Sequence, residues 1–188
     1  MVADPLKALF QTGVLPVPQA GQRVLFINGR VAPPLSAWPQ KNIIVQQYFK
    51  PWADETARGG LKTVPEIPAG PFDIVLALAP RQHDEALHVM AAALSALKTD
   101  GTLICAAANT EGGKRLKKDA KYLGFSCAEE SKHKSRVIWG VKHTIDEAHC
   151  AEATANGGYR KVCGGRFVSR PGVFSWDRVD PGSALLAK

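Results

Sequence analysis

Basic side chains that could bind phosphate gather in one stretch of this chain. Between Gly112 and Lys142 the sequence has nine lysines and arginines against three acidic residues, so +6 of the net charge of +7 lies there. Clustered positive charge attracts anions, and nucleic acid is the commonest large anionic partner. We predict a phosphate-binding surface made of Lys114, Arg115, Lys117, Lys118, Lys121, Lys132, Lys134 and Arg136. The alternative is a solvated helix face with a basic turn, because runs of charge usually serve solubility.

Residues that could bind a nucleotide-like cofactor are scarce at the predicted strand ends, where a mostly parallel sheet binds its ligands. A dinucleotide or adenosylmethionine site needs a glycine-rich turn after the first strand, because the backbone must approach the ligand closely. Here Asn28 is followed by one glycine, and the next strand ends at Gln46 and Gln47 rather than at a carboxylate. Asn109, after a later strand, is a lone polar residue of the kind that usually belongs to a turn. We therefore predict no catalytic and no cofactor-binding residue in this chain.

Histidines and cysteines form no recognisable motif for a metal or a nucleophile. His83 and His88 are five residues apart, so they do not share a helix face at the spacing of metal ligands. The other candidates fit no zinc pattern; they are His143, His149, Cys150 and Cys163. No Gly-x-Ser-x-Gly turn occurs either. We predict no metal site, and four reduced, unpaired cysteines.

The stretch 71–109 predicts a strand, a helix and a strand, and the rest of the fold is expected to be built around it. Residues 74–79 and 103–108 are apolar at consecutive positions, as in strands that are covered on both faces. Lys98 falls in the predicted last turn of the helix between them. The apolar face of that helix consists of Leu87, Met90, Leu94 and Leu97. A helix that joins two such strands makes them parallel.

The remaining segments predict an α/β fold with a doubly wound, mostly parallel sheet and a C-terminal antiparallel hairpin. Strands are expected at 23–28, 42–49, 61–64, 125–130 and 136–142, and helices at 4–12, 51–60 and 114–123. The link 29–41 holds three prolines, so we expect at most about a turn of helix there, at 35–38. From His143 onward paired glycines predict a short β-rich linker, and 180–188 begins like a helix. We divide the chain into an α/β domain, 1–142, and a linker with the start of a following domain, 143–188.

Length and composition are those of a folded, water-soluble domain. The chain has 188 residues, of which 45% are hydrophobic and 22% charged, enough to bury a core. The N-terminus lacks the features of a signal peptide, and no apolar run reaches membrane-spanning length. We therefore expect the protein to be cytoplasmic.

The predicted order of elements resembles that of class I S-adenosylmethionine (SAM)-dependent methyltransferases. Five strands of a doubly wound sheet are followed by a helix and an antiparallel hairpin that carries Trp139. The tail, RPGVFSWDRVDPGSALLAK, is similar to the segment that leads into the catalytic domain of bacterial small-subunit ribosomal RNA guanine-N2 methyltransferases, which have two tandem methyltransferase-like halves. The resemblance is carried by Pro171, Gly172, Val173, Phe174 and Ser175, and then by Asp180, Gly182, Ser183, Leu185 and Leu186.

That resemblance implies a degenerate, Rossmann-like N-terminal half that does not catalyse, but supports the catalytic half and helps to bind ribosomal RNA. In this family the C-terminal half binds SAM through an acidic and glycine-rich loop, and catalyses through an Asn-Pro-Pro-aromatic motif. Neither motif occurs here, so no cofactor or catalytic residue can be carried over to this sequence. SAM is expected to bind a following catalytic domain of the same chain, and not this part.

Two other functions remain open from the sequence. One is a SAM-binding methyltransferase that is active in its own right, with a divergent pocket around Asn28, Gln47 and Asn109. The other is a purely structural domain that shields or orients the catalytic half. Trp38 and Trp52 could stack on RNA bases, although tryptophans in proline-rich connectors usually pack back onto the sheet.

Overall fold

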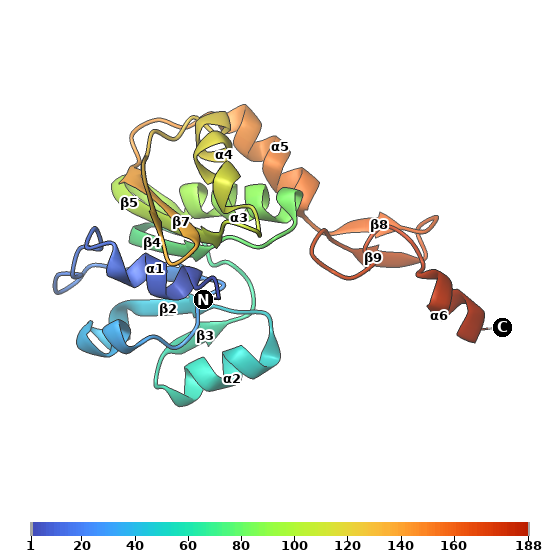
Figure 1. Ribbon diagram of the computed structural model, residues 1–188, viewed down its shortest axis with the longest axis horizontal. Coiled ribbons are helices and arrows are strands. Elements are labelled where there is room, and N and C mark those ends of the chain that lie inside the picture. The colour runs from blue at the N-terminus through green and yellow to red at the C-terminus, as the bar shows by residue number, and fades with distance from the viewer. Residues whose placement is uncertain (1, 188) are drawn as a thin grey trace.

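A seven-stranded sheet forms the centre of the protein in a computed structural model that describes residues 2–187 (Figure 1). The strands lie in the order β3-β2-β1-β4-β5-β7-β6. The first five pair in parallel, whereas β7 pairs antiparallel with both β5 and β6. The prediction of a mostly parallel, doubly wound sheet with an antiparallel hairpin is confirmed. The strands are β1 (Val24–Ile27), β2 (Ile43–Gln46), β3 (Lys62–Val64), β4 (Phe72–Leu78), β5 (Leu97–Ala108), β6 (Ala128–Lys132) and β7 (Ser135–Val141).

Helices cover both faces of this sheet. On one face lie α3 (His83–Ala96), α4 (Leu116–Tyr122) and α5 (Glu147–Gly157), and on the other α1 (Pro5–Gln11) and α2 (Lys50–Arg58) (Figure 1). Side chains alternate between the two sides, so Leu25 of β1 packs in the core under α3 while Phe26 packs in the core under α1. None of the described helices is long and apolar enough to cross a membrane.

The unit β4-α3-β5 is the predicted strand-helix-strand, with one correction. Lys98 does not lie in the last turn of α3, because the chain becomes extended at Leu97, which pairs with Phe72 of β4. Lys98 instead forms an ion pair with Asp73. A register irregularity follows before Thr102 resumes the pairing with β4. Strand β5 therefore begins directly at the end of the helix.

Two crossover connections contain no α-helix. Between β1 and β2 the chain makes only the 3-10 turns η1 (Pro33–Ala37) and η2 (Gln40–Asn42), as the prolines of this link predict. Between β3 and β4, residues 65–71 form an irregular connector with three prolines. Because the connection between β3 and β4 has no helix, part of the sheet face at β1 and β2 is not covered by a helix.

Helix α5 was not predicted, since a β-rich linker was expected from His143 onward. Asp146 caps this helix by accepting a hydrogen bond from the backbone of His149 at 2.9 Å. At its other end Gly157 lies against α3, where a Cβ atom would stand 2.2 Å from Cβ of His88. The helix therefore packs closely on α3. The division of domains at residue 142 stays a prediction, and α5 lies beyond it in sequence.

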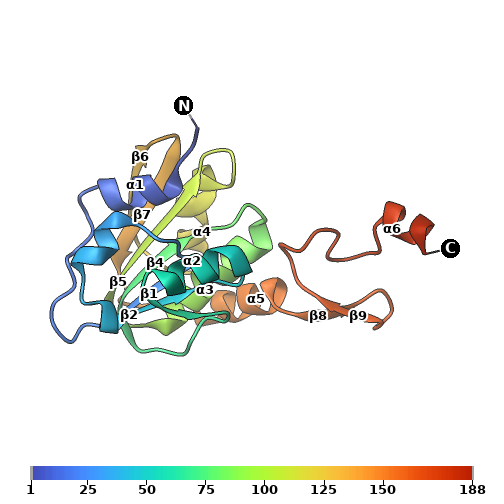
Figure 2. The ribbon, with the colours of Figure 1, turned by 90° about the horizontal axis from the view of Figure 1, so that it is seen from below.

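The C-terminal part forms an arm that extends away from the sheet (Figures 1 and 2). It consists of a two-stranded antiparallel hairpin, β8 (Arg160–Val162) and β9 (Phe167–Ser169), and a final helix α6 (Pro181–Leu186). The predicted β-rich segment and terminal helix are confirmed, with Asp180 as the N-cap of α6. Lys188, which the prediction included, lies outside the described residues.

Candidate functional site

The carboxyl ends of the parallel strands meet at one edge of the sheet, which we call the carboxyl edge. Here Asn28, at positive φ, follows β1, and its side-chain amide donates to the carbonyl of Leu78 at 2.9 Å. The side chain of Gln46 accepts from the backbone of Asn28 at 3.1 Å. That of Gln47, which is buried, donates to the carbonyl of Gly29 at 2.9 Å. The polar side chains at these strand ends therefore form hydrogen bonds with the protein backbone.

Gly29 is required at this edge by packing. A Cβ atom on Gly29 would stand 2.6 Å from Cγ1 of Val45 and 2.7 Å from the ring of Phe26. The glycine thus allows the chain to turn tightly over its own core. It does not open a space in which a ligand could approach the backbone.

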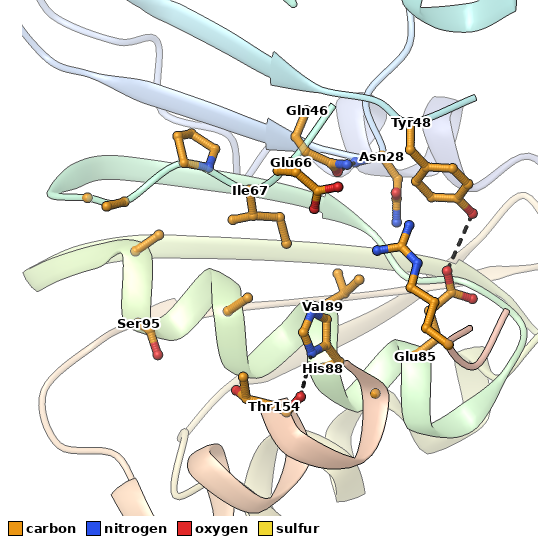
Figure 3. A pocket seen from close by; sticks show the side chains of 17 residues that line it. Asn28, Gln46, Tyr48, Glu66, Ile67, Glu85, His88, Val89, Ser95 and Thr154 are labelled. Carbon is orange, nitrogen blue, oxygen red and sulfur yellow. Dashed lines mark hydrogen bonds between the residues drawn. The ribbon is translucent and has the colours of Figure 1, made fainter. Parts of the chain in front are cut away.

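A cavity of about 470 Å³ lies where a crossover helix between β3 and β4 would otherwise pack (Figure 3). One wall is the proline-rich connector, including Glu66 and Ile67, and another is α3, including His88 and Val89. The remaining lining includes Asn28, Gln46, Tyr48, Glu85, Thr154 and Arg170. Of the three residues in the divergent pocket suggested by the sequence, only Asn28 lines this cavity; Gln47 and Asn109 do not.

At one end of this cavity Tyr48, Glu85 and Arg170 come together from distant parts of the chain (Figure 3). The hydroxyl of Tyr48 donates to Oε1 of Glu85 at 3.4 Å. The guanidinium of Arg170 lies over two rings, 4.9 Å from the centroid of Tyr48 and 4.8 Å from that of Tyr159. Burial raises the pKa of Glu85, which is only 7% exposed. Burial and the neighbouring carboxylate likewise raise the pKa of the Tyr48 hydroxyl.

These contacts hold the segment after β9 against the sheet and α3. Gly172 fits beside Glu85, because a Cβ atom there would stand 2.2 Å from a carboxylate oxygen. No pattern in the sequence around Arg170 or Gly172 predicts a contact with α3, so the sequence analysis missed this cluster. Its geometry is that of an anchor at the base of the arm.

The predicted basic surface is divided by its own ion pairs. Lys117 and Arg136 both reach Glu129, at 3.4 and 3.2 Å. Arg115 lies 3.9 Å from Asp119, which also contacts His83 at 3.2 Å. The remaining exposed cations have no ion-pair partner within residues 2–187; they are Lys114, Lys118, Lys121 and Lys134.

Part of this basic surface lies at the carboxyl edge. Strand β7 runs antiparallel to β5 and pairs its first residue, Ser135, with Ala108, so the β6-β7 turn lies where β5 ends. In this turn the carbonyl of Lys134 accepts from the backbone of Asn109 at 2.9 Å. The 3-10 turn η3 (Gly113–Arg115), with Lys114, also follows β5 and leads into α4. The carboxyl edge is thus basic on the side of β5.

Lysines 132 and 142, although part of the charge cluster in sequence, have structural partners. Lys132 donates to the carbonyl of Gln11 in α1 at 2.6 Å. Beside it the backbone of Asp4 donates to the carbonyl of His133, so α1 is bound to the β6-β7 turn. Lys142 is half-buried and donates to the carbonyls at the end of α3. A count of charges in the sequence could not separate these lysines from those that are free.

The histidines and cysteines do not converge. Among the described residues no three His, Cys, Asp or Glu side chains are placed to hold a metal ion. His143 lies 3.0 Å from Asp100, whereas His149 stacks on Tyr122 with ring centroids 4.1 Å apart. All four cysteines are free, as predicted, and burial raises the pKa of the Cys105 thiol to about 12.

Comparison with known proteins identifies similar folds among solved structures. No protein-family model matches the chain, and no curated protein matches it by sequence. The Thermus thermophilus 16S rRNA N2 G1207 methyltransferase RsmC, in complex with AdoMet and guanosine, matches with a TM-score of 0.71 and 22% identity. The match covers 98% of this chain and 51% of RsmC, so the chain spans about half the length of that enzyme.

Other similar structures are methyltransferases of different substrates. An O-methyltransferase family protein from Burkholderia thailandensis matches with a TM-score of 0.53 and 15% identity, over 65% of this chain and 51% of that one. A ribosomal protein L11 methylase from Lactobacillus delbrueckii matches with a TM-score of 0.50 and 12% identity, over 74% and 77%. These neighbours are all described as methyltransferases or methylases, and the chain has the Rossmann-like fold that they share.

Proposed function

We propose that this chain is the non-catalytic N-terminal half of a SAM-dependent ribosomal RNA guanine-N2 methyltransferase. In this role it supports the catalytic half of the same chain and contributes to RNA binding. The observation that carries the proposal is the match to RsmC, which takes in 98% of this chain but only 51% of that enzyme. RsmC is named as a 16S rRNA N2 G1207 methyltransferase, and its structure contains AdoMet and guanosine.

The carboxyl edge supports the non-catalytic part of the proposal. In a catalytic methyltransferase fold the turn after β1 must leave room for SAM. Here the backbone N–H of Asn28 donates to the side chain of Gln46, and the carbonyl of Gly29 accepts from the side chain of Gln47, so neither backbone group is available to a ligand. A carboxylate for ribose hydroxyls and a glycine-rich turn are both absent from residues 28–49 of the sequence.

The arm supports the second part, a contact with a catalytic half. Phe174, Leu185 and Leu186 are 83%, 70% and 92% exposed, although large apolar side chains gain free energy by leaving water. Contiguous exposed apolar surface commonly marks a surface for another protein unit. A following domain that packs on the arm would cover these side chains.

Charge reversal on η3 and α4 tests the RNA-binding part. Lys114 of η3 and Lys118 and Lys121 of α4 are exposed and have no ion-pair partner within residues 2–187, and each phosphate they neutralise releases counterions. The triple change K114E/K118E/K121E should weaken binding to a fragment of small-subunit ribosomal RNA. It should also flatten the plot of log affinity against log salt by about 2 units, which titration at several salt concentrations measures.

The matched control reverses three exposed lysines elsewhere, in K41E/K62E/K161E, and so produces the same net charge. This control should keep most of the affinity and salt dependence of the unmodified chain. Equal loss in the two triple variants, or an affinity that does not depend on salt, would contradict the electrostatic account. If the unmodified chain binds no RNA at all, a purely structural role is the better description.

A second candidate function, a domain that binds SAM and is active alone, is favoured by the cavity of about 470 Å³ beside Asn28 and Gln46. Calorimetric titration of the 188-residue chain with SAM separates the two. We expect no binding at micromolar concentrations. Micromolar binding that Arg170→Ala weakens would place the cofactor in this cavity and replace our first proposal.

A further inference from the structure

Two aromatic side chains lie together where β2 leads into α2, at the carboxyl edge. Phe49 is 47% exposed, and the partly covered Trp52 follows in the first turn of α2. The rings of Phe49 and Trp52 pack edge to face with centroids 4.9 Å apart. Single exposed aromatic residues are common, but two packed together at the surface are the kind of patch that often binds a partner.

An arginine completes this surface. Arg30, which follows β1, holds its guanidinium carbon 3.4 Å from the centroid of the Trp52 ring. At this distance the guanidinium is in stacking contact with the ring, and a guanidinium plane can itself be stacked upon. Arg30 is exposed, so its plane can be reached from solvent. Trp38, in contrast, is buried beside Phe10 in the core and is not part of this surface.

We propose that Arg30, Phe49 and Trp52 form a platform on which unpaired RNA bases stack. Unpaired bases are bound in proteins by aromatic rings and by arginine planes, because every base has a face that can stack. The platform shares the carboxyl edge with Lys114 and Lys134, which can hold the phosphates of the same strand. The inference rests on the proposed RNA-binding function, but it assigns a different surface and a single-stranded ligand.

The charges around the platform favour bases over phosphates. Burial lowers the pKa of Arg30, and the nearby carboxylates of Asp4, Glu111 and Glu55 partly offset this effect. On α2, Lys50 pairs with Asp54 at 2.5 Å. The platform therefore has little excess positive charge, and its contribution to binding should depend only weakly on salt. This separates it from the lysines of α4, whose contribution is electrostatic.

Two substitutions test the platform in the full chain. Phe49→Ala removes an exposed ring, and Arg30→Lys keeps the positive charge but removes the stacking plane. Fluorescence anisotropy would measure binding to an unstructured RNA of about 12 nucleotides and to a duplex of the same sequence. Each variant should lower single-strand affinity by about tenfold, with duplex affinity and the salt dependence unchanged. Phe167→Ala, which removes a similarly exposed ring from the arm, is the matched control and should change neither affinity.

The outcomes separate this inference from the proposed function. Unchanged single-strand affinity in both variants, or equal losses for single strand and duplex, would overturn the platform and leave the lysines of α4 untouched as an RNA surface. Loss of single-strand binding in Phe49→Ala, without any effect of reversing Lys114, Lys118 and Lys121, would support the platform and contradict the electrostatic account. Circular dichroism melting of each variant checks that the fold is kept.

Discussion

Glu85 shows how one residue can serve two parts of the fold. It lies in the first turn of α3, where a negative charge is favoured by the exposed N–H groups of the helix. Its side chain is nevertheless almost fully buried, between the hydroxyl of Tyr48 and the backbone of Gly172. Arg170 lies in the same cavity. Glu85 therefore links α3 and the end of β2 to the base of the arm.

Burial of Glu85 makes stability depend on pH at this residue. Because its pKa is raised in the folded protein, the folded state holds this proton more tightly than the unfolded state does. Stability from this group is thus full below the unfolded pKa and is lost as the pH rises through the folded pKa. Glu85→Gln cannot ionise but still offers Tyr48 an oxygen. Relative to the unmodified protein, the variant should become more stable as the pH rises from about 4 to about 8.

Melting temperatures across this pH range measure the effect. Glu66→Gln removes an exposed carboxylate that lines the same cavity, and it controls for the loss of one negative charge. A stability difference between Glu85→Gln and the unmodified chain that stays constant across the range would show that Glu85 does not titrate as described.

At the scale of elements, the end of α3 depends on a lysine that lies far away in sequence. Lys142, at the end of β7, donates to the carbonyls of Leu94 and Leu97 at 2.7 and 2.8 Å. Carbonyls at a helix C-terminus have no partner within the helix, and a cation there also interacts favourably with the negative end of the helix dipole. Lys142→Met should lower the free energy of unfolding by about 1.5–3 kcal/mol. Lys121→Met, at an exposed position of α4, should change it by less than about 0.5 kcal/mol in urea denaturation.

Strongly apolar elements could be predicted from the sequence, and elements built from small residues could not. Most of β4 and the second half of β5, residues 74–78 and 103–108, are continuous apolar runs, so their type and parallel pairing follow from sequence pattern. The buried residues of α5 are Cys150, Ala153 and Gly157, which recur at helical spacing but are too small to stand out as an apolar face. They are small because α5 packs closely on α3, and that contact is not visible in the local sequence.

The candidate site shows the same division. The basic run and the poor cofactor turn could be predicted because each is local in sequence. Strand β2 is shorter than predicted and ends at Gln46. The backbone of Gln47 still donates to the carbonyl of Val64, and its side chain donates to that of Gly29. Tyr48 and Phe49 follow beyond the strand at the carboxyl edge, where each is about half exposed. Arg30 meets Trp52 only because β1 and β2 are neighbours in the sheet. Such contacts depend on the order of strands in the sheet, and the spacing of residues in the sequence does not predict them.

At the scale of the whole molecule, two truncations test where the α/β domain ends. Within the described residues, no side chain beyond Ala153 belongs to either hydrophobic core cluster. The fragment 1–158, which keeps α5, should therefore unfold cooperatively, within about 2 kcal/mol of the full chain. The fragment 1–142 exposes the face of α3 that α5 covers, and should lose a further 2–4 kcal/mol or so. Equal stability of the two fragments would support the boundary predicted at residue 142.

The attachment of α1 to the β6-β7 turn also has a consequence for the order of events during synthesis. Ala8 and Leu9 of α1 are fully buried, but the carbonyl of Gln11 is bound by Lys132, 121 residues later. At ribosomal rates of about 5–20 residues per second, the helix emerges roughly 6–24 s before that partner exists. During this interval its apolar face is open to solvent and to chaperones. Helix α1 is thus made before the other described elements but is among the last to dock, and its docking marks the completion of the sheet.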